Sequence, residues 1–165
     1  MLKLKKIGRL LGTAAMTALL SCGLALPGQA AEESVDFRLV TRSLDLKVEQ
    51  IPTVEGQMVG LGHFAGVALF SDGRIANKDF RFSFDYMKGA GPFFGYSTYT
   101  FEDGSALTMR FAGENKAGTP MRGEYTILSG TGKYEGATGS GYFEAQDDPW
   151  EGANLFAGAL QITTP

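Results

Sequence analysis

Asp79-Phe80-Arg81-Phe82-Ser83-Phe84-Asp85-Tyr86 alternates polar and aromatic side chains without a break. A period of two places the four aromatic side chains on one face of a β-strand and the polar side chains on the other. The stretch therefore predicts a strand with one buried face and one face in water. Because burying charge is costly, we expect Asp79, Arg81 and Asp85 on the outside; on an inner face they would form a charged site.

The same pattern recurs along the chain, with turn signals every eight to fifteen residues. We expect strands at 35–51, 63–70, 74–86, 94–101, 106–111, 124–128, 141–145 and 155–163. The first range alternates in two registers, as either one long bent strand or two short strands would. Ser71-Asp72-Gly73 and Glu102-Asp103-Gly104 have the composition of hairpin turns, in which glycine takes positive φ. No stretch has helical periodicity, so the fold class is all-β, an antiparallel barrel or sandwich.

Residues 1–31 have the composition of a secretory signal peptide. A basic start is followed by an apolar stretch over 10–26 and by small residues around Gly28-Gln29-Ala30-Ala31. We expect cleavage after Ala30 or Ala31, which leaves one domain, 32–165, secreted or periplasmic. A membrane anchor is the competing interpretation, but an apolar run of about 17 residues is short for a bilayer span. We therefore expect no stable membrane insertion.

Cys22 is the only cysteine and lies inside this leader. Leu19-Leu20-Ser21-Cys22 resembles a bacterial lipobox, so lipid anchoring through Cys22 is an alternative to ordinary cleavage. We favour ordinary cleavage because the residues after Cys22 stay apolar. The domain then has no cysteine, which excludes a disulfide, a thiol nucleophile and a thiolate metal site.

The charge of the domain argues against two classes of partner. All 18 acidic residues lie at or after Glu32, whereas four of the 15 basic residues lie in the leader. The domain has 18 acids against 11 bases. Nucleic acids and anionic membrane surfaces select basic patches, so we expect neither as a partner.

A glycine-rich stretch, Gly130-Thr131-Gly132-Lys133-Tyr134-Glu135-Gly136-Ala137-Thr138-Gly139, separates two late strands. It follows the hairpin 96–107 and the strand Gly123-Glu124-Tyr125-Thr126-Ile127, and Gly141-Tyr142-Phe143 comes after it. This series resembles the allene oxide cyclase and dirigent superfamily, and most of all its secreted bacterial members. The resemblance covers roughly residues 64–145 and implies an eight-stranded antiparallel barrel of calycin type, open at one end, that can form a homo-oligomer. Ser129 and Thr138 stand where dirigents usually have glycine and arginine, and no catalytic residue is transferred.

The aromatic residues are the main candidates for a binding site. We expect most of them to be core, but an eight-stranded barrel can either be filled by side chains or hold one small ligand. Inward tyrosine hydroxyls would supply the few polar groups that a pocket needs. The candidate lining residues are Phe80, Phe82, Phe84, Tyr86, Tyr96, Tyr99 and Phe111.

Two other features have a chemical and a structural interpretation. His63, the only histidine, could act as a general base, but no partner is evident and we favour a surface or rim position. Carboxylates gather around Pro149-Trp150 and could bind calcium, although their spacing matches no established loop and an exposed turn is favoured. They are Glu144, Asp147, Asp148 and Glu151. We predict neither a metal nor a cofactor.

The sequence therefore favours a secreted, non-catalytic barrel that binds a small hydrophobic or aromatic molecule. The first alternative is an isomerase or cyclase that guides a reactive intermediate, as the resemblance implies. The second alternative is a structural or interaction protein at the cell surface.

Overall fold

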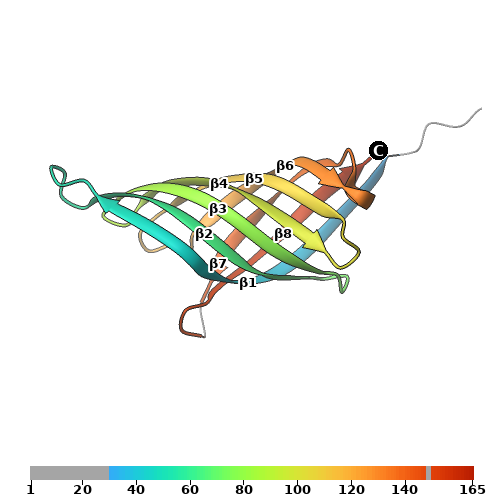
Figure 1. The fold of residues 1–165 in the computed structure, drawn as a ribbon, viewed down its shortest axis with the longest axis horizontal. Helices are drawn as coiled ribbons and strands as arrows, with labels where there is room; N and C mark the ends of the chain where they lie inside the picture. Colours follow the sequence, from blue (N-terminus) through green and yellow to red (C-terminus); the bar gives the residue numbers. More distant parts are fainter. Residues whose placement is uncertain (1–29, 148–149) are drawn as a thin grey trace, which may run out of the picture.

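The computed structural model describes residues 30–147 and 150–165 (Figure 1). Within them, eight antiparallel strands follow one another: β1 (Ala31–Gln50), β2 (Gln57–Phe70), β3 (Ile75–Met87), β4 (Gly91–Phe101), β5 (Ala106–Asn115), β6 (Arg122–Thr131), β7 (Thr138–Gln146) and β8 (Asn154–Thr164). A short 3-10 turn, η1 (Gly132–Tyr134), separates β6 from β7. Each strand pairs with the next and β8 pairs with β1, so the sheet closes into a barrel. The predicted all-β, eight-stranded antiparallel barrel is confirmed.

Both predicted hairpin turns are present. Gly73 and Gly104 have φ angles of 90° and 79°, and each donates its backbone N–H to the carbonyl that begins its turn. The predicted signal peptide and Cys22 lie outside the described residues, apart from Ala30 and Ala31 at the end of the predicted leader. Across 30–147 and 150–165, no helix has the length and apolar composition needed to span a membrane.

The two registers of the first predicted strand arise from a β-bulge in a single long strand. Ser43 pairs with Phe64 and Asp45 pairs with His63, so Leu44 is an extra residue in the β1–β2 ladder. One extra residue reverses the alternation of side chains along a strand. Odd-numbered residues of β1 are therefore buried before the bulge, whereas Leu46 and Val48 face the interior after it.

The bulge also marks where β1 leaves the barrel wall. Its pairing with β8 ends at Thr41, and beyond that residue β1 pairs with β2 alone. The β1–β2 hairpin consequently projects past the other strands, at the left of Figure 1. We call this end of the barrel the open end.

The opposite end, which we call the closed end, is filled by side chains around Arg74. The guanidinium of Arg74 lies 5.6 Å from the ring centres of both Phe70 and Phe101, and it donates hydrogen bonds to the Tyr134 hydroxyl and the Glu33 carboxylate. The Tyr134 ring also packs on Phe101, with 5.0 Å between ring centres. This plug combines a paired cation with aromatic faces, which is a stable way to bury an arginine.

The glycine-rich stretch folds back to complete the plug. Gly132 and Gly136 have φ angles of 61° and 71°, which side chains with a Cβ rarely adopt. At Gly130, a Cβ would stand 2.0 Å from the carbonyl oxygen of Tyr134. The stretch therefore needs glycine so that Tyr134, buried in η1, can turn back over the end of the barrel.

Candidate functional site

An apolar cavity of about 380 Å³ occupies the barrel between the plug and the open end. Its mouth is lined by residues of β1, β2 and β3 near the open end, including Val48, Met58 and Tyr86, and its floor includes Leu39 and Lys78. The remaining lining residues are Leu46, Phe64, Phe80, Phe82, Phe84, Phe93, Phe111, Met121, Tyr125, Phe143, Asn154 and Phe156. Aromatic rings make up most of this wall, and an interior of this kind is a favourable environment for an apolar molecule.

Glycines on β2 give the aromatic rings of β3 their positions. Gly62 pairs with Phe82 and Gly60 pairs with Phe84 in the β2–β3 ladder. A Cβ at either glycine would come within 2.4 Å of the facing ring. The rings therefore lie over the backbone of β2 at these two glycines. Side chains at the two positions would occupy the space that the rings and the cavity take up.

One lysine is buried in the part of the chain that the structure describes, and it lies at the cavity floor. Lys78 is 3% exposed, and its Nζ atom donates hydrogen bonds to the hydroxyl oxygens of Tyr125, at 2.5 Å, and Tyr99, at 3.2 Å. The centres of five aromatic rings lie between 4.8 and 5.9 Å from the same atom. These rings belong to Phe80, Tyr99, Phe111, Tyr125 and Phe143.

No acidic side chain among the described residues lies close enough to Lys78 to hold its charge. None of the ion pairs formed within 30–147 and 150–165 includes it. Burial lowers the pKa of Lys78 well below its usual range, because the ammonium form loses its hydration. Burial likewise raises the pKa of Tyr99 and of Tyr125, so both phenols keep their protons at neutral pH. The floor of the cavity is therefore a small group of polar side chains in which burial disfavours the charged form of each.

Most of the predicted lining residues lie on the cavity. Phe80, Phe82, Phe84, Tyr86 and Phe111 contribute to its wall. Tyr99 is fully buried and reaches the floor through its hydrogen bond to Lys78.

Tyr96 is a correction to that set. Its side chain is 52% exposed and lies on the outer surface. It cannot share the inner face with Tyr99, because residues three apart on one strand point to opposite faces.

Lys78 and Tyr125 were missed as candidates, although the pattern of the sequence contains them. Lys78 has the same parity as Phe80 in the strand predicted over 74–86, so strict alternation places it inside. The residue type gives the opposite indication, because lysine is almost never fully buried without a partner. Tyr125 follows the same rule on β6, where Gly123, Tyr125 and Ile127 are the buried positions.

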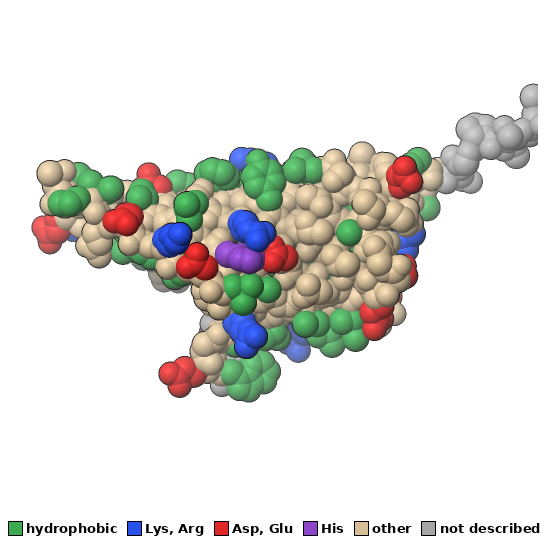
Figure 2. All heavy atoms as spheres, in the orientation of Figure 1, with side chains coloured by type: hydrophobic (Ala, Val, Ile, Leu, Met, Phe, Trp, Pro, Cys, Tyr) green, Lys and Arg blue, Asp and Glu red, His purple; other side chains and the backbone are tan. Residues whose placement is uncertain are grey.

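His63 lies on the outer surface, where its imidazole contacts the Asp79 carboxylate at 2.7 Å. Arg81 contacts the other oxygen of Asp79 at 2.6 Å, and Figure 2 shows the single histidine between basic and acidic side chains on the barrel wall. Burial opposes ionisation of Asp79, but these two neighbours together hold the pKa of its carboxyl below the usual range. Asp85 is exposed on the same strand and accepts a hydrogen bond from Gln57. The expected outer placement of the charged face of this strand is confirmed.

The acidic turn remains a prediction. Glu144 is 3.7 Å from the guanidinium of Arg122. Over the part of the chain that the structure describes, no three histidine, cysteine or acidic side chains gather as metal ligands do, and Asp148 lies outside that part.

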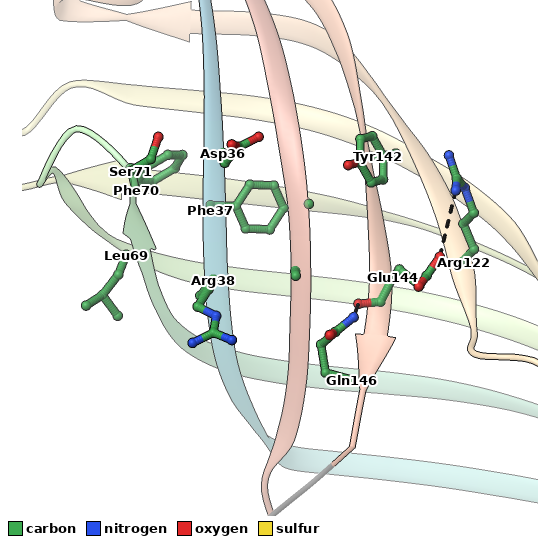
Figure 3. A pocket seen from close by; sticks show the side chains of 12 residues that line it. Asp36, Phe37, Arg38, Leu69, Phe70, Ser71, Arg122, Tyr142, Glu144 and Gln146 are labelled. Atoms are coloured by element: carbon green, nitrogen blue, oxygen red, sulfur yellow. Dashed lines mark hydrogen bonds and ion pairs between the residues drawn. The ribbon is translucent and has the colours of Figure 1, made fainter.

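The outer wall also has a shallow hollow of about 650 Å³ across β1, β8 and β7 (Figure 3). Its rim includes side chains of both signs, among them Asp36, Arg38, Arg122 and Glu144. Figure 3 shows them spread around the hollow, with only Arg122 and Glu144 paired. The hollow is larger than the inner cavity but open to water, so it offers neither enclosure nor a buried polar group. The inner cavity is therefore the stronger candidate site.

Comparison with known proteins identifies the fold. No protein-family model matches the chain, and no curated protein matches it in sequence. Among solved structures, the pterocarpan synthase dirigent protein GePTS1 is similar with a TM-score of 0.55 and 14% identity over 82% of this chain and 92% of that one. The pterocarpan synthase dirigent protein PsPTS1 gives a TM-score of 0.49 at 14% identity, over 83% and 96% of the two chains. The barrel is thus dirigent-like in fold, as the resemblance in sequence implied.

Proposed function

We propose that this barrel binds one small hydrophobic or aromatic molecule in its inner cavity and acts outside the cytoplasm as a carrier or receptor without catalysis. The observation that carries the proposal is the inner cavity of about 380 Å³, lined almost wholly by aromatic and aliphatic side chains. Pockets for small ligands usually have volumes of roughly 300–1,000 Å³ and a few convergent polar groups on an apolar wall. The cavity has both properties.

The composition of the wall indicates the chemistry of the ligand. Apolar surface removed from water contributes about 25 cal/mol per Å², so a molecule that fills the cavity gains affinity from contact with the wall alone. Rings such as Phe64 and Phe82 meet at steep angles, 68° in this pair, and so present edges and faces in turn. Aromatic ligands pack well against such a surface.

The predicted leader supports a location outside the cytoplasm, in a secreted or periplasmic protein. A domain without cysteine suits that location because it has no thiol to oxidise. Outside the cytoplasm, a protein that binds an apolar molecule can carry it through water, in which it is poorly soluble.

A second candidate is an isomerase or cyclase, and the polar floor is the observation that favours it. Lys78 and the two tyrosine hydroxyls can hold a polar atom of an intermediate or move a proton to it, while the aromatic wall fixes its conformation. The protein similar in fold is named as a pterocarpan synthase, which is consistent with chemistry in such a barrel. The test uses a molecule that copurifies with the protein. If the natural protein converts this molecule on prolonged incubation and the Lys78→Met variant does not, this second function is favoured.

The binding function is tested with N-phenyl-1-naphthylamine, an uncharged aromatic probe that fluoresces in apolar sites. We expect saturable binding of one probe per chain to residues 32–165. Phe84→Ala, which alters the cavity wall, changes the affinity severalfold, whereas Phe94→Ala on the outer surface does not. Binding that does not saturate, or that responds equally to both substitutions, contradicts the proposal.

A further inference from the structure

We infer that Lys78 forms an imine with a carbonyl group of the molecule in the cavity, so that the class of ligand is a hydrophobic aldehyde or ketone. This inference rests on the binding function proposed above and specifies the group on the ligand that the floor of the cavity recognises.

The first support is the position of the amine. Lys78 lies near the start of β3, toward the closed end, and its side chain lines the cavity among mainly apolar residues. A ligand that enters from the open end reaches this nitrogen with its leading atoms and leaves the rest of its surface against the aromatic wall. The amine and the carbonyl are then held together in one enclosed space, which raises their effective concentration.

The second support is the lack of any competing partner. Within the described residues, the Nζ atom has hydrogen bonds only to two neutral phenols, and no carboxylate pairs with it. An unprotonated amine has a lone pair and is a nucleophile, and burial favours that form here. A desolvated lysine in an apolar pocket is one of the arrangements that activate the residue for imine formation.

The reaction needs no reagent beyond amine and carbonyl. The nitrogen of Lys78 forms a bond to the carbonyl carbon, and the carbonyl oxygen becomes a hydroxyl. That hydroxyl leaves as water, the nitrogen lone pair forms the C=N bond, and the two amine protons depart with the oxygen. Tyr125, 2.5 Å from the nitrogen, is placed to give a proton to the leaving hydroxyl and to receive one from the nitrogen.

The surrounding rings suit the product as well as the reactant. Five ring centres lie within 5.9 Å of the nitrogen, so its surroundings are mainly apolar. The imine that the reaction leaves is neutral, and it therefore needs no carboxylate counter-ion in this position. A carboxylate ligand, by contrast, requires Lys78 to be charged before binding, which its burial disfavours.

The experiment uses 1-naphthaldehyde and sodium cyanoborohydride at neutral pH, followed by peptide mass spectrometry. Reduction traps an imine as a secondary amine whose mass exceeds that of lysine by the aldehyde less one oxygen atom. We expect modification of Lys78 ahead of the exposed Lys47, Lys88 and Lys116, and its suppression by excess N-phenyl-1-naphthylamine. Tyr125→Phe slows the trapping at Lys78 by at least about tenfold, whereas Tyr142→Phe on the outer surface leaves the rate unchanged.

The possible failures are distinguishable. If the naphthylamine binds but only surface lysines are trapped, the imine is excluded and the binding function stands. If 1-naphthoic acid binds tightly under those conditions, the floor recognises an anion and the inference is overturned. If neither the naphthylamine nor the aldehyde is taken up, the binding function fails together with the inference. Because suppression by the naphthylamine is measured on the natural sequence, the test does not depend on a variant that folds.

Discussion

Gly62 lies opposite Phe82 in the β2–β3 ladder, and a Cβ at Gly62 would stand 2.4 Å from the edge of the Phe82 ring. The atoms in its way belong to the far end of that ring, which can move, rather than to the backbone. The absence of one side chain on β2 thus sets the position of a ring that forms part of the cavity wall.

Gly62→Ala is expected to displace the Phe82 ring and to weaken binding of N-phenyl-1-naphthylamine by about tenfold, or about 1.4 kcal/mol. The free energy of unfolding should fall by about 1 kcal/mol, because crowding outweighs the lower entropy of the unfolded chain. Fluorescence titration and urea unfolding measure the two effects. Leu61→Ala, on the outer face of the same strand, is the matched control and should leave binding unchanged.

Lys78→Met is expected to change how stability depends on pH. Burial lowers the pKa of Lys78 in the folded chain, whereas the unfolded chain restores it to about 10.4. Between those two values the unfolded chain binds more protons, so the free energy of unfolding rises with pH, by up to about 1.4 kcal/mol per pH unit. Lys78→Met removes this rise, which urea unfolding from about pH 7 to pH 9 can measure.

The rise of stability with pH is expected to end at about pH 10. Burial also raises the pKa of Tyr99 and of Tyr125, so above about pH 10 the unfolded chain loses their protons first and stability falls again. An identical slope in the natural protein and Lys78→Met at pH 7 to 9 would show that the buried amine is charged in the folded state.

Tyr134→Phe should loosen the plug at the closed end without affecting the cavity. The substitution removes the hydroxyl that accepts a hydrogen bond from the Arg74 guanidinium. A hydrogen bond to a charged group contributes about 1.5–3 kcal/mol, and we expect a loss of that order in urea unfolding. Binding of the naphthylamine should be unchanged. Tyr142→Phe, on the outer surface, controls for removal of a hydroxyl as such, and an equal loss there would refute a specific role for the plug.

His63→Ala is expected to leave uptake of the naphthylamine unchanged and to reduce stability by less than about 1 kcal/mol. The imidazole pairs with Asp79 on the outer surface, where solvent screens such contacts. Parallel titrations of the natural protein and the variant test this. A large effect on uptake would mean that the outer surface, and not the inner cavity, is the binding site.

Alternation along the strands predicted most of the fold because one face of each strand is buried. The run from Asp79 to Tyr86 indicated both the strand and its inner face, and the four aromatic side chains of the run line the cavity. The alternation in the first strand was visible too, but only pairing with β2 shows that Leu44 is an extra residue in one continuous strand. A bulge and a break between two strands have the same pattern in sequence.

The site was predicted less completely because residue type and position gave conflicting indications. Lys78 alternates in register with the inward-facing Phe80, although lysine is usually an exposed residue type. Its position in the strand, and not its residue type, determines that it is buried. Tyr96 and Tyr99 have equal chemistry but opposite parity, so only one of them can face the interior. The plug could not be predicted at all, since Arg74 and Tyr134 meet only once the barrel has closed.

Among the described residues, the plug fills one end of the barrel and leaves the open end as the entrance to the cavity. Under the proposed binding function, a molecule in the cavity has a leading end, which meets Lys78, and a trailing end near the projecting β1–β2 hairpin. Recognition is then strict at the leading end, where polar atoms must match, and tolerant at the trailing end, where extra length extends into water. Such a protein would sort ligands by their terminal functional group rather than by their size, and ligands of one chemical class but different chain length would compete for it on nearly equal terms.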